Sequence, residues 1–259
     1  LNFSQIKKIS YLLGLNVSNF KNINGETDLK TNISFDLDKK FKVRNLSYSI
    51  EGDINYLEVE TGETRIVKEY LPEFDSKIVL KDSNIKLTNS TSDRRTELNG
   101  LIKVQDNYDN FKIKEIYNYD KRSFDISGIV DLTNSKVDIP RLNYTKNKGK
   151  KSEIAFDINF VLNKYYNIRN LNFLEDKSKI NLSNIKLNKN FEVLDFNKLE
   201  IKTFLNEIKN NDFLVKKSER VTISGKVFDA QSLLKSLYKK SNKKTFSKNF
   251  NSEIKINFD

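Results

Sequence analysis

Long stretches of the chain alternate between apolar and polar residues, and this period of two constrains the fold more than any other feature of the sequence. Every second residue of the segment SEIAFDINFVL is apolar: Ile154, Phe156, Ile158, Phe160 and Leu162. Residues 32–38, NISFDLD, repeat the pattern. Because successive side chains of a strand point to opposite faces of a sheet, both segments predict half-buried strands with one apolar face.

Turns have to be made largely without the two strongest turn residues, because the 259 residues include only 8 Gly and 2 Pro. Asn, Asp, Lys and Ser take their place between the alternating segments. The pattern predicts long antiparallel strands joined by polar turns, without the crossover helices of a parallel sheet. The expected fold is mainly β: an elongated, curved, largely antiparallel β-sheet of repeated strand units, groove-like, with one or two short helices.

The chain also repeats a short β unit. Residues 31–48 and 156–173 align without a gap, and their best-matched parts read FKVRNLSY and YNIRNLNF. Weaker copies keep apolar residues at positions i, i+2 and i+5: Phe111, Ile113, Ile116; Val137, Ile139, Leu142, Tyr144; and Phe191, Val193, Phe196. Each copy taken alone is better explained by core strands with a common hairpin style, but five together favour a repeated architecture.

The spacing of i+5 has a physical consequence, because strict alternation would place residues i and i+5 on opposite faces of the sheet. One extra residue has to be absorbed between them. A β-bulge or sharp bend at Arg44–Asn45, and another at Arg169–Asn170, would return the apolar side chains to one face. We therefore expect two equivalent strand pairs with irregular backbone at Asn45 and Asn170.

Two segments have helical spacing. The first, SQIKKISYLLG at residues 4–14, ends at a Gly that is typical of a helix terminus. The second follows Asp229, which is suited to cap it, and continues with Leu233, Leu234 and Leu237. The expected organisation is a helix and connector at 1–24, a repetitive β-sheet region at 25–228, a capping helix at 229–240, and a basic linker with the start of the next strand at 241–259.

Missing residue types narrow the chemistry. The sequence has no His and no Cys, which excludes imidazole bases, thiolate nucleophiles and ordinary zinc sites. No pair of acidic residues stands in a recognisable catalytic or metal-ligand context, so we expect no enzyme activity, no cofactor and no metal. The chain also has no Met, not even at position 1, and we expect it to be a piece of a longer protein.

The formal net charge of +11 would ordinarily suggest nucleic acid or an anionic membrane as a partner. The Lys residues are, however, interspersed with acidic residues rather than gathered in one block. The densest run, KKSNKKTFSK at residues 239–248, has the composition of a solvated linker. We expect no nucleic-acid partner.

The segment RVTISGKVFDAQSLLKSL, at residues 220–237, resembles the AsmA-like proteins, particularly the YhdP-type branch. In that family a strand ending in Gly, a basic residue, a hydrophobic residue and Asp leads into a short Leu-rich helix. The residues that carry the resemblance are Ser224, Gly225, Lys226, Phe228, Asp229, Leu233 and Leu234. The segment FNSEIKINFD is similar to the strand that restarts the sheet, and the likeness in style extends over most of residues 25–259.

The resemblance implies a segment of a large protein anchored in the inner membrane of a Gram-negative bacterium. Such a protein spans the periplasm and conducts phospholipid, or another acyl-chain lipid, between the inner and outer membranes through an apolar β-groove. Attachment to both membranes would then use segments outside this chain. The candidate groove residues come from the repeated apolar stripe: Ile33, Phe35, Leu37, Phe41, Val43, Ile158, Phe160, Leu162, Tyr166 and Ile168.

Two other classes of function stay open at this point. A structural or adhesive β-repeat scaffold of the cell envelope would bury the same apolar stripe completely. An enzyme acting on a polysaccharide or a lipid head group would need acidic residues to converge in a pocket. The exposure of Phe35, Phe41, Phe160 and Tyr166 distinguishes an open groove from a closed core.

Overall fold

The computed structural model describes residues 20–62, 65–231, 234 and 252–258. Strands account for 70% of these residues and helix for very few, which confirms the predicted mainly β, curved and largely antiparallel fold. The predicted helix at residues 4–14 lies outside the described residues. The chain divides into two compact units, residues 1–121 and 122–259.

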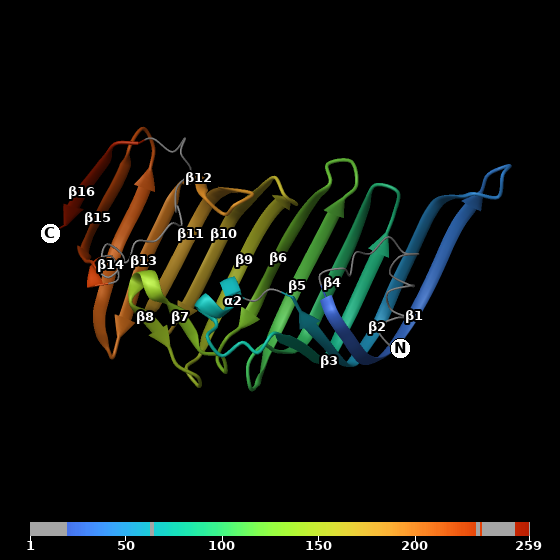
Figure 1. The fold of residues 1–259 in the computed structure, drawn as a ribbon, viewed down its shortest axis with the longest axis horizontal. Coiled ribbons are helices and arrows are strands. Elements are labelled where there is room, and N and C mark those ends of the chain that lie inside the picture. The colour runs from blue at the N-terminus through green and yellow to red at the C-terminus, as the bar shows by residue number, and fades with distance from the viewer. Residues whose placement is uncertain (1–19, 63–64, 232–233, 235–251, 259) are drawn as a thin grey trace. The chain divides into compact units, whose positions relative to one another are not determined.

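The first unit is an antiparallel sheet with the strand order β1-β2-β3-β4-β5 (Figure 1). Its elements are β1 (Phe20–Leu37), β2 (Val43–Thr61), α2 (Arg65–Tyr70), β3 (Lys77–Asn89), β4 (Asp93–Lys103) and β5 (Tyr108–Asn118). The first strand begins at residue 20, inside the predicted connector at 1–24. The short helix α2, between β2 and β3, has no counterpart among the sequence predictions.

The two faces of this sheet differ sharply in polarity. One row of residues that are partners on neighbouring strands reads Leu29, Gly52, Ile85, Leu98 and Ile113. The adjacent row, on the opposite face, reads Lys30, Glu51, Lys86, Glu97 and Lys114. Opposite charges therefore alternate across five strands, and Lys114 Nζ lies 2.8 Å from Glu97 Oε1. This arrangement explains why Lys residues alternate with acidic residues in the sequence of this unit: both lie on the solvated face of the sheet.

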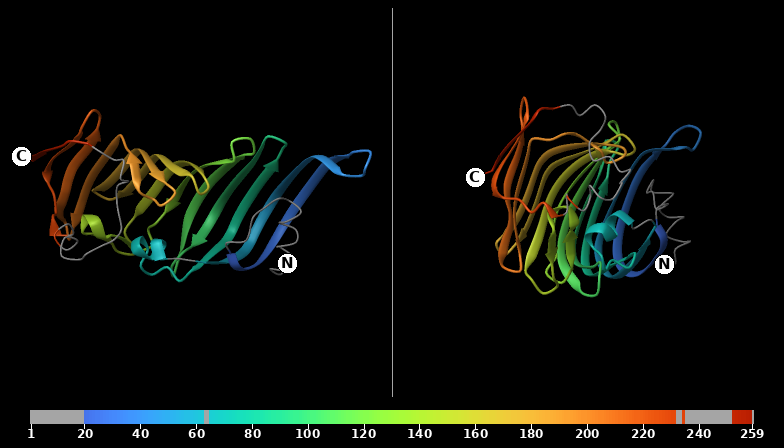
Figure 2. Two further views of the ribbon diagram at one scale, coloured as in Figure 1. Left: turned by 45° about the horizontal axis from the view of Figure 1, so that its top comes forward. Right: turned by 60° about the vertical axis from the view of Figure 1, so that its left-hand side comes forward.

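The second unit is a larger sheet, with the strand order β6-β9-β10-β11-β13-β14-β15-β16 and β12 paired to β11. Its strands are β6 (Ser123–Asp131), β9 (Ser152–Val161), β10 (Tyr165–Glu175), β11 (Ser178–Asn188), β12 (Val193–Asp195), β13 (Lys198–Leu205), β14 (Ile208–Lys217), β15 (Val221–Val227) and β16 (Ile254–Phe258). Between β6 and β9 the chain forms a separate small hairpin of β7 (Val137–Ile139), η1 (Pro140–Leu142) and β8 (Tyr144–Lys146). Neither unit's sheet closes on itself (Figure 2).

The last described strand corrects one prediction. β16 pairs with β15 in parallel, whereas the sequence led us to expect no crossover connection. The connection starts as predicted, because Asp229 Oδ1 accepts a hydrogen bond of 3.0 Å from the backbone N–H of Gln231. The N–H of Leu234 then donates to Ala230 O over 2.9 Å, which is a helical hydrogen bond. Residues 232–233 and 235–251, which include most of the predicted helix, lie outside the described residues.

Both predicted bulges are present. In β2 the pairing moves from Ser34–Ser47 to Asp36–Arg44, so β2 contains one extra residue, and Asn45 has φ 51°. In β10 the pairing moves from Ile168–Ile158 to Asn170–Asp157, with Arg169 as the extra residue. Both segments are thus strand pairs with a bulge at or next to the Arg-Asn dipeptide.

The Arg-Asn pairs hold these bulges through carboxylates. Arg169 Nη1 lies 2.7 Å from Asp125 Oδ1, and its Nη2 lies 2.5 Å from Asp157 Oδ1, so one guanidinium ties β10 to β9 and β6. In the first unit, Asn45 Nδ2 donates to Asp36 Oδ2 over 2.8 Å. The Arg-Asn dipeptide shared by the two segments is therefore explained by these local contacts at the bulges.

The weaker copies are not equivalent to these two, which contradicts the prediction of five repeats. The pairing of β4 with β5 runs without a register shift, so Ile113 and Ile116 point to opposite faces. Residues 137–144 form the small hairpin, and residues 191–196 form a turn and β12. The i, i+2, i+5 spacing in these segments arises from different local structures.

Candidate functional site

The second unit has a continuous apolar face. Cross-strand partners on this face form three successive rows: Ile126, Ile158, Ile168, Ile185; then Phe156, Leu171, Leu182, Leu199, Val215, Ile223, Ile256; then Val130, Ile154, Phe173, Ile180, Ile201, Phe213, Gly225, Phe258. Neighbouring strands lie about 4.8 Å apart, so the face extends about 34 Å from β6 to β16. The bulge in β10 keeps Leu171 in register with Phe156 and thus preserves the face.

A row of stacked aromatic rings forms one margin of this face. The ring centroids of Phe124 and Phe160 lie 4.9 Å apart, those of Phe160 and Tyr166 5.6 Å apart, and those of Tyr166 and Phe191 4.7 Å apart. All three pairs are stacked, with interplanar angles of 12°, 27° and 22°. The first three rings are half-buried, and Phe191 is 53% exposed. This margin is therefore accessible to solvent.

The opposite margin is covered by the β7–β8 hairpin. The ring of Tyr144 is buried and lies edge-on to Phe173, with 6.0 Å between their centroids. The Tyr144 hydroxyl donates a hydrogen bond of 2.6 Å to Glu175 Oε2. Burial, and then the Glu175 carboxylate, raise the pKa of the Tyr144 phenol. The hairpin is fixed from within by the buried ammonium of Lys146, which donates to the carbonyls of Leu132, Thr133 and Ser135.

Under the hairpin the face changes from apolar to polar. The buried residues at the ends of the strands there are Ser152, Glu175, Ser178, Thr203 and Asn211. Asn211 Nδ2 donates to Leu142 O over 2.8 Å and to Thr203 Oγ1 over 2.9 Å, and its Oδ1 accepts from the N–H of Asp229. These hydrogen bonds satisfy buried polar groups that would otherwise be costly to place there. The apolar face thus ends at a hydrogen-bonded margin.

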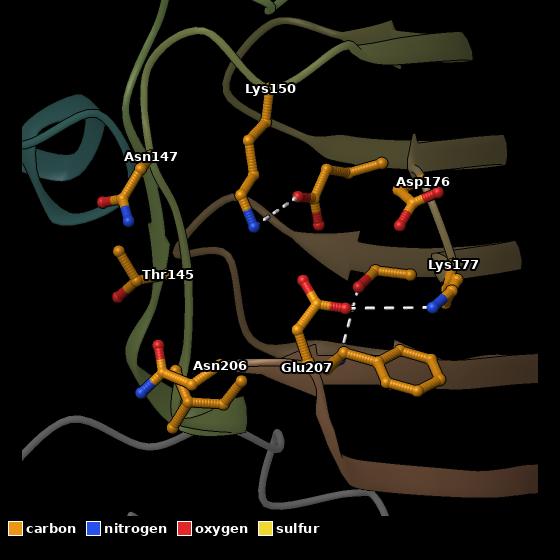
Figure 3. A pocket seen from close by; sticks show the side chains of 11 residues that line it. Thr145, Asn147, Lys150, Asp176, Lys177, Asn206 and Glu207 are labelled. Carbon is orange, nitrogen blue, oxygen red and sulfur yellow. Dashed lines mark hydrogen bonds and ion pairs between the residues drawn. The ribbon is translucent and has the colours of Figure 1, made fainter.

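A polar pocket of about 240 Å³ opens beside this margin (Figure 3). Its charged groups face one another: Lys150 Nζ lies 3.8 Å from Glu175 Oε1, and Lys177 Nζ lies 3.8 Å from Glu207 Oε2. The one buried hydroxyl in its lining, Ser178 Oγ, accepts a hydrogen bond of 3.2 Å from the N–H of Phe204. These contacts hold the turns of β10–β11 and β13–β14 together and provide no paired nucleophile and base.

The candidate residues of the second unit divide into two groups. Four of them lie together on the apolar face and are half-buried: Ile158, Phe160, Tyr166 and Ile168. Leu162 lies in the three-residue turn between β9 and β10 and is 54% exposed. Sequence reasoning missed Phe124 and Phe191, which complete the aromatic row.

The candidate residues of the first unit have a different environment from the one expected. Ile33, Phe35, Leu37 and Val43 are 50–55% exposed, and Phe41 is 83% exposed in the turn at residues 38–42. They form the end of the β1–β2 hairpin. Their exposure corresponds neither to a filled core nor to the half-buried rows of the second unit.

The buried polar margin was also missed. The signal was present in β14, IKNNDFLVKK, where Asn211 occupies an alternating position with Phe213 and Val215. A polar residue at a core-facing position of a strand indicates a buried hydrogen-bond network.

Among the described residues, no group of three or more Asp and Glu side chains could hold a metal ion. Within the same residues, no helix has the length and apolar character needed to cross a bilayer. The chain matches no protein-family model, no curated protein and no solved structure.

Proposed function

We propose that the chain binds acyl chains of phospholipid, or of a similar lipid, on the apolar face of its second unit and makes or breaks no bond. On this proposal it is a segment of an inner-membrane-anchored protein that carries lipid across the periplasm of a Gram-negative bacterium. The observation that carries the proposal is the continuous apolar face, which has one accessible aromatic margin. The cellular setting comes from the AsmA-like resemblance.

The energetics favour such a role. Each methylene of an acyl chain costs about 0.8 kcal/mol to keep in water, so ten methylenes cost about 8 kcal/mol. A face of isoleucine, leucine and phenylalanine side chains removes most of this cost wherever a chain lies on it. Binding of this kind is non-directional, and it therefore lets a lipid slide from one row to the next.

The structural-scaffold alternative requires the same side chains to be buried by protein. In the described residues the β7–β8 hairpin covers one margin of the face. Phe196, which is buried together with Ile185 and Val221, covers part of the neighbouring rows. Phe124, Phe160 and Tyr166 are left half-exposed at the other margin. This accessibility favours a ligand over a purely structural role.

The test uses the complete 259-residue chain, purified without detergent and examined by native mass spectrometry and lipid extraction. The decisive variant is Phe160→Asp. Because Phe160 is only half-buried, an Asp there keeps contact with water, so the sheet is expected to fold and to lose bound lipid. The matched control is Ile129→Asp, which places the same charge on the opposite face of β6, at a residue that is 47% exposed.

The expected result is lipid on the wild-type chain and on Ile129→Asp, and none on a folded Phe160→Asp chain. Absence of lipid from the wild-type chain, combined with unfolding of Phe160→Asp, would favour the scaffold. Equal lipid content in both variants would also contradict the proposal.

A further inference from the structure

The end of the β1–β2 hairpin is an exposed apolar surface in the first unit. We define the hairpin tip as residues 33–44. Alternation along β1 places Ile33, Phe35 and Leu37 on one face, and Val43 is the cross-strand partner of Leu37. Each of these side chains is at least 50% exposed. Side chains of this kind clustered on a surface indicate a binding site.

The turn of the hairpin tip is organised by one carboxylate. Asp38 Oδ1 accepts hydrogen bonds of 2.9 Å from the N–H groups of both Lys40 and Lys42, and Oδ2 accepts from the Arg44 guanidinium at 3.1 Å and 3.2 Å. The backbone N–H of Phe41 donates to Asp38 O over 2.9 Å. Phe41 is held at φ 57°, a conformation uncommon for an aromatic residue, and its side chain is 83% exposed. The turn therefore presents Phe41 to solvent in a fixed geometry.

The charge of the hairpin tip is basic. Four cationic residues follow one another closely around the turn: Lys39, Lys40, Lys42 and Arg44. The two acidic residues of the segment are engaged locally, because Asp38 holds the turn and Asp36 accepts from Asn45. Exposed apolar side chains bordered by Lys and Arg match the chemistry of an anionic membrane surface.

We propose that the hairpin tip docks on an anionic lipid bilayer, with its apolar side chains in the interface and its basic residues at the lipid phosphates. The strand rise of about 3.4 Å per residue places Phe35 about 7 Å from Leu37. Phe41, Leu37, Val43 and Phe35 thus fit within the 5–10 Å depth typical of interfacial insertion. This docking is a separate activity from acyl-chain binding on the second unit and does not depend on it.

The sequence contains no Trp, so Phe41→Trp places a single fluorescent reporter in the turn. The complete chain is mixed with vesicles of equal parts phosphatidylglycerol and phosphatidylcholine, or of phosphatidylcholine alone. We expect a blue shift and quenching by brominated lipids only with the anionic vesicles. The matched control is Ile208→Trp, at the β13–β14 turn, where the side chain is 73% exposed but lies next to Glu207. Its emission is expected to stay unchanged.

Two further variants separate the apolar from the electrostatic contribution. The double variant Leu37→Ser/Phe41→Ser is expected to weaken vesicle binding by about tenfold or more, because two exposed apolar side chains no longer enter the interface. Replacing Lys39, Lys40 and Lys42 by Gln is expected to weaken it by about fivefold per residue. Circular dichroism confirms that these surface changes leave the sheet folded.

Lack of any spectral shift with anionic vesicles would overturn the proposal, and so would equal binding to neutral vesicles. A dimer that dissociates in Leu37→Ser/Phe41→Ser would assign the surface to a second copy of the chain instead. The Phe160→Asp variant keeps an intact hairpin tip and is expected to bind vesicles normally. Failure of docking and failure of acyl-chain binding are thus distinguished by different variants.

Discussion

The hydroxyl of Tyr144 offers the most direct measure of how firmly the β7–β8 hairpin covers the apolar face. Changing Tyr144→Phe keeps the ring against Phe173 and removes only the donor that binds Glu175 Oε2 at 2.6 Å. The carboxylate is then left at a buried position, where its remaining charged neighbour is Lys150 at 3.8 Å. The change therefore tests only the hydrogen bonds that this hydroxyl makes with the sheet, to Glu175 and with Ser178.

The expected size of the Tyr144→Phe effect follows from the burial of the hydrogen bond and the charge of its acceptor. A hydrogen bond to a charged group contributes about 1.5–3 kcal/mol, and loss of a partner in a buried site incurs the larger part of that range. We expect Tyr144→Phe to lower the free energy of opening of the hairpin by about 2 kcal/mol. This corresponds to about a 30-fold loss of protection.

The assay is hydrogen–deuterium exchange of residues 137–146 in the complete chain, with urea unfolding as a second readout. The matched control is Tyr56→Phe, which removes a tyrosine hydroxyl that donates to Glu58 over 2.9 Å at an exposed position. Exposed contacts of this kind contribute at most about 0.5 kcal/mol, so Tyr56→Phe is expected to change neither readout measurably.

Equal effects of the two Tyr→Phe changes would refute this reasoning, because burial would then make no difference to the hydrogen bond. Unchanged exchange at residues 137–146 in Tyr144→Phe would show that the hairpin is held by other contacts. In that case the hydrogen bonds from Asn210 and Asn211 to the carbonyls of residues 142–143 would be the attachment.

Three further expectations follow from single contacts. Gly225→Ala places a methyl group 2.6 Å from Phe213 Cβ and should destabilise the chain by about 1–3 kcal/mol in urea unfolding, whereas Ser224→Ala, on the opposite face, should have little effect. Asp229→Ala removes both the helix cap and the 2.7 Å hydrogen bond from Asn143. It should lower the free energy of unfolding by about 2 kcal/mol, whereas loss of a cap alone would lower it by about 1 kcal/mol. Acyl-chain binding should be unchanged. Hydrogen bonds from the N–H groups of Lys42 and Lys40, and the Arg44 guanidinium, hold the pKa of Asp38 below its ordinary value of 3.8. The Asp38 carboxylate therefore stabilises the turn above that pH, and the turn should loosen only as the pH falls through the lower folded pKa, which exchange broadening of the Lys40 and Lys42 amide signals would report. Broadening of these signals already at neutral pH would contradict the role given to Asp38.

The strands were predictable because a period of two is a direct consequence of strand geometry. Residues 152–161 form a strand whose apolar positions share one face, and the bulges at Asn45 and Arg169 were required by the i+5 spacing. The helix α2 could not be predicted, since RIVKEY is too short to show a helical period. The parallel pairing of β15 with β16 was missed for another reason: the helix predicted after Asp229 was interpreted as a cap and not as the crossover connection that parallel strands need.

The candidate site was only partly predictable, for a related reason. Alternation identifies which residues share a face, but it does not show what lies above that face. Tyr144 and Lys146 belong to a segment whose sequence looks like another repeat, yet it leaves the large sheet and covers one margin. The hydrogen bonds between this hairpin and Asn211 join residues 69 positions apart, a distance at which a single sequence carries no pairing signal.

The length of one turn decides how the same repeated sequence is used in the two units. Phe41 and Tyr166 occupy equivalent positions in the repeat, but the first hairpin turns over residues 38–42 and the second over residues 162–164. The shorter turn brings Tyr166 into β10 as the partner of Phe160, where stacking on two rings half-buries it. The longer turn leaves Phe41 outside the strands and exposes it. A difference of two turn residues thus converts an aromatic side chain of the apolar face into a solvent-exposed one. For this reason we propose acyl-chain binding for the second unit and membrane docking for the hairpin tip of the first.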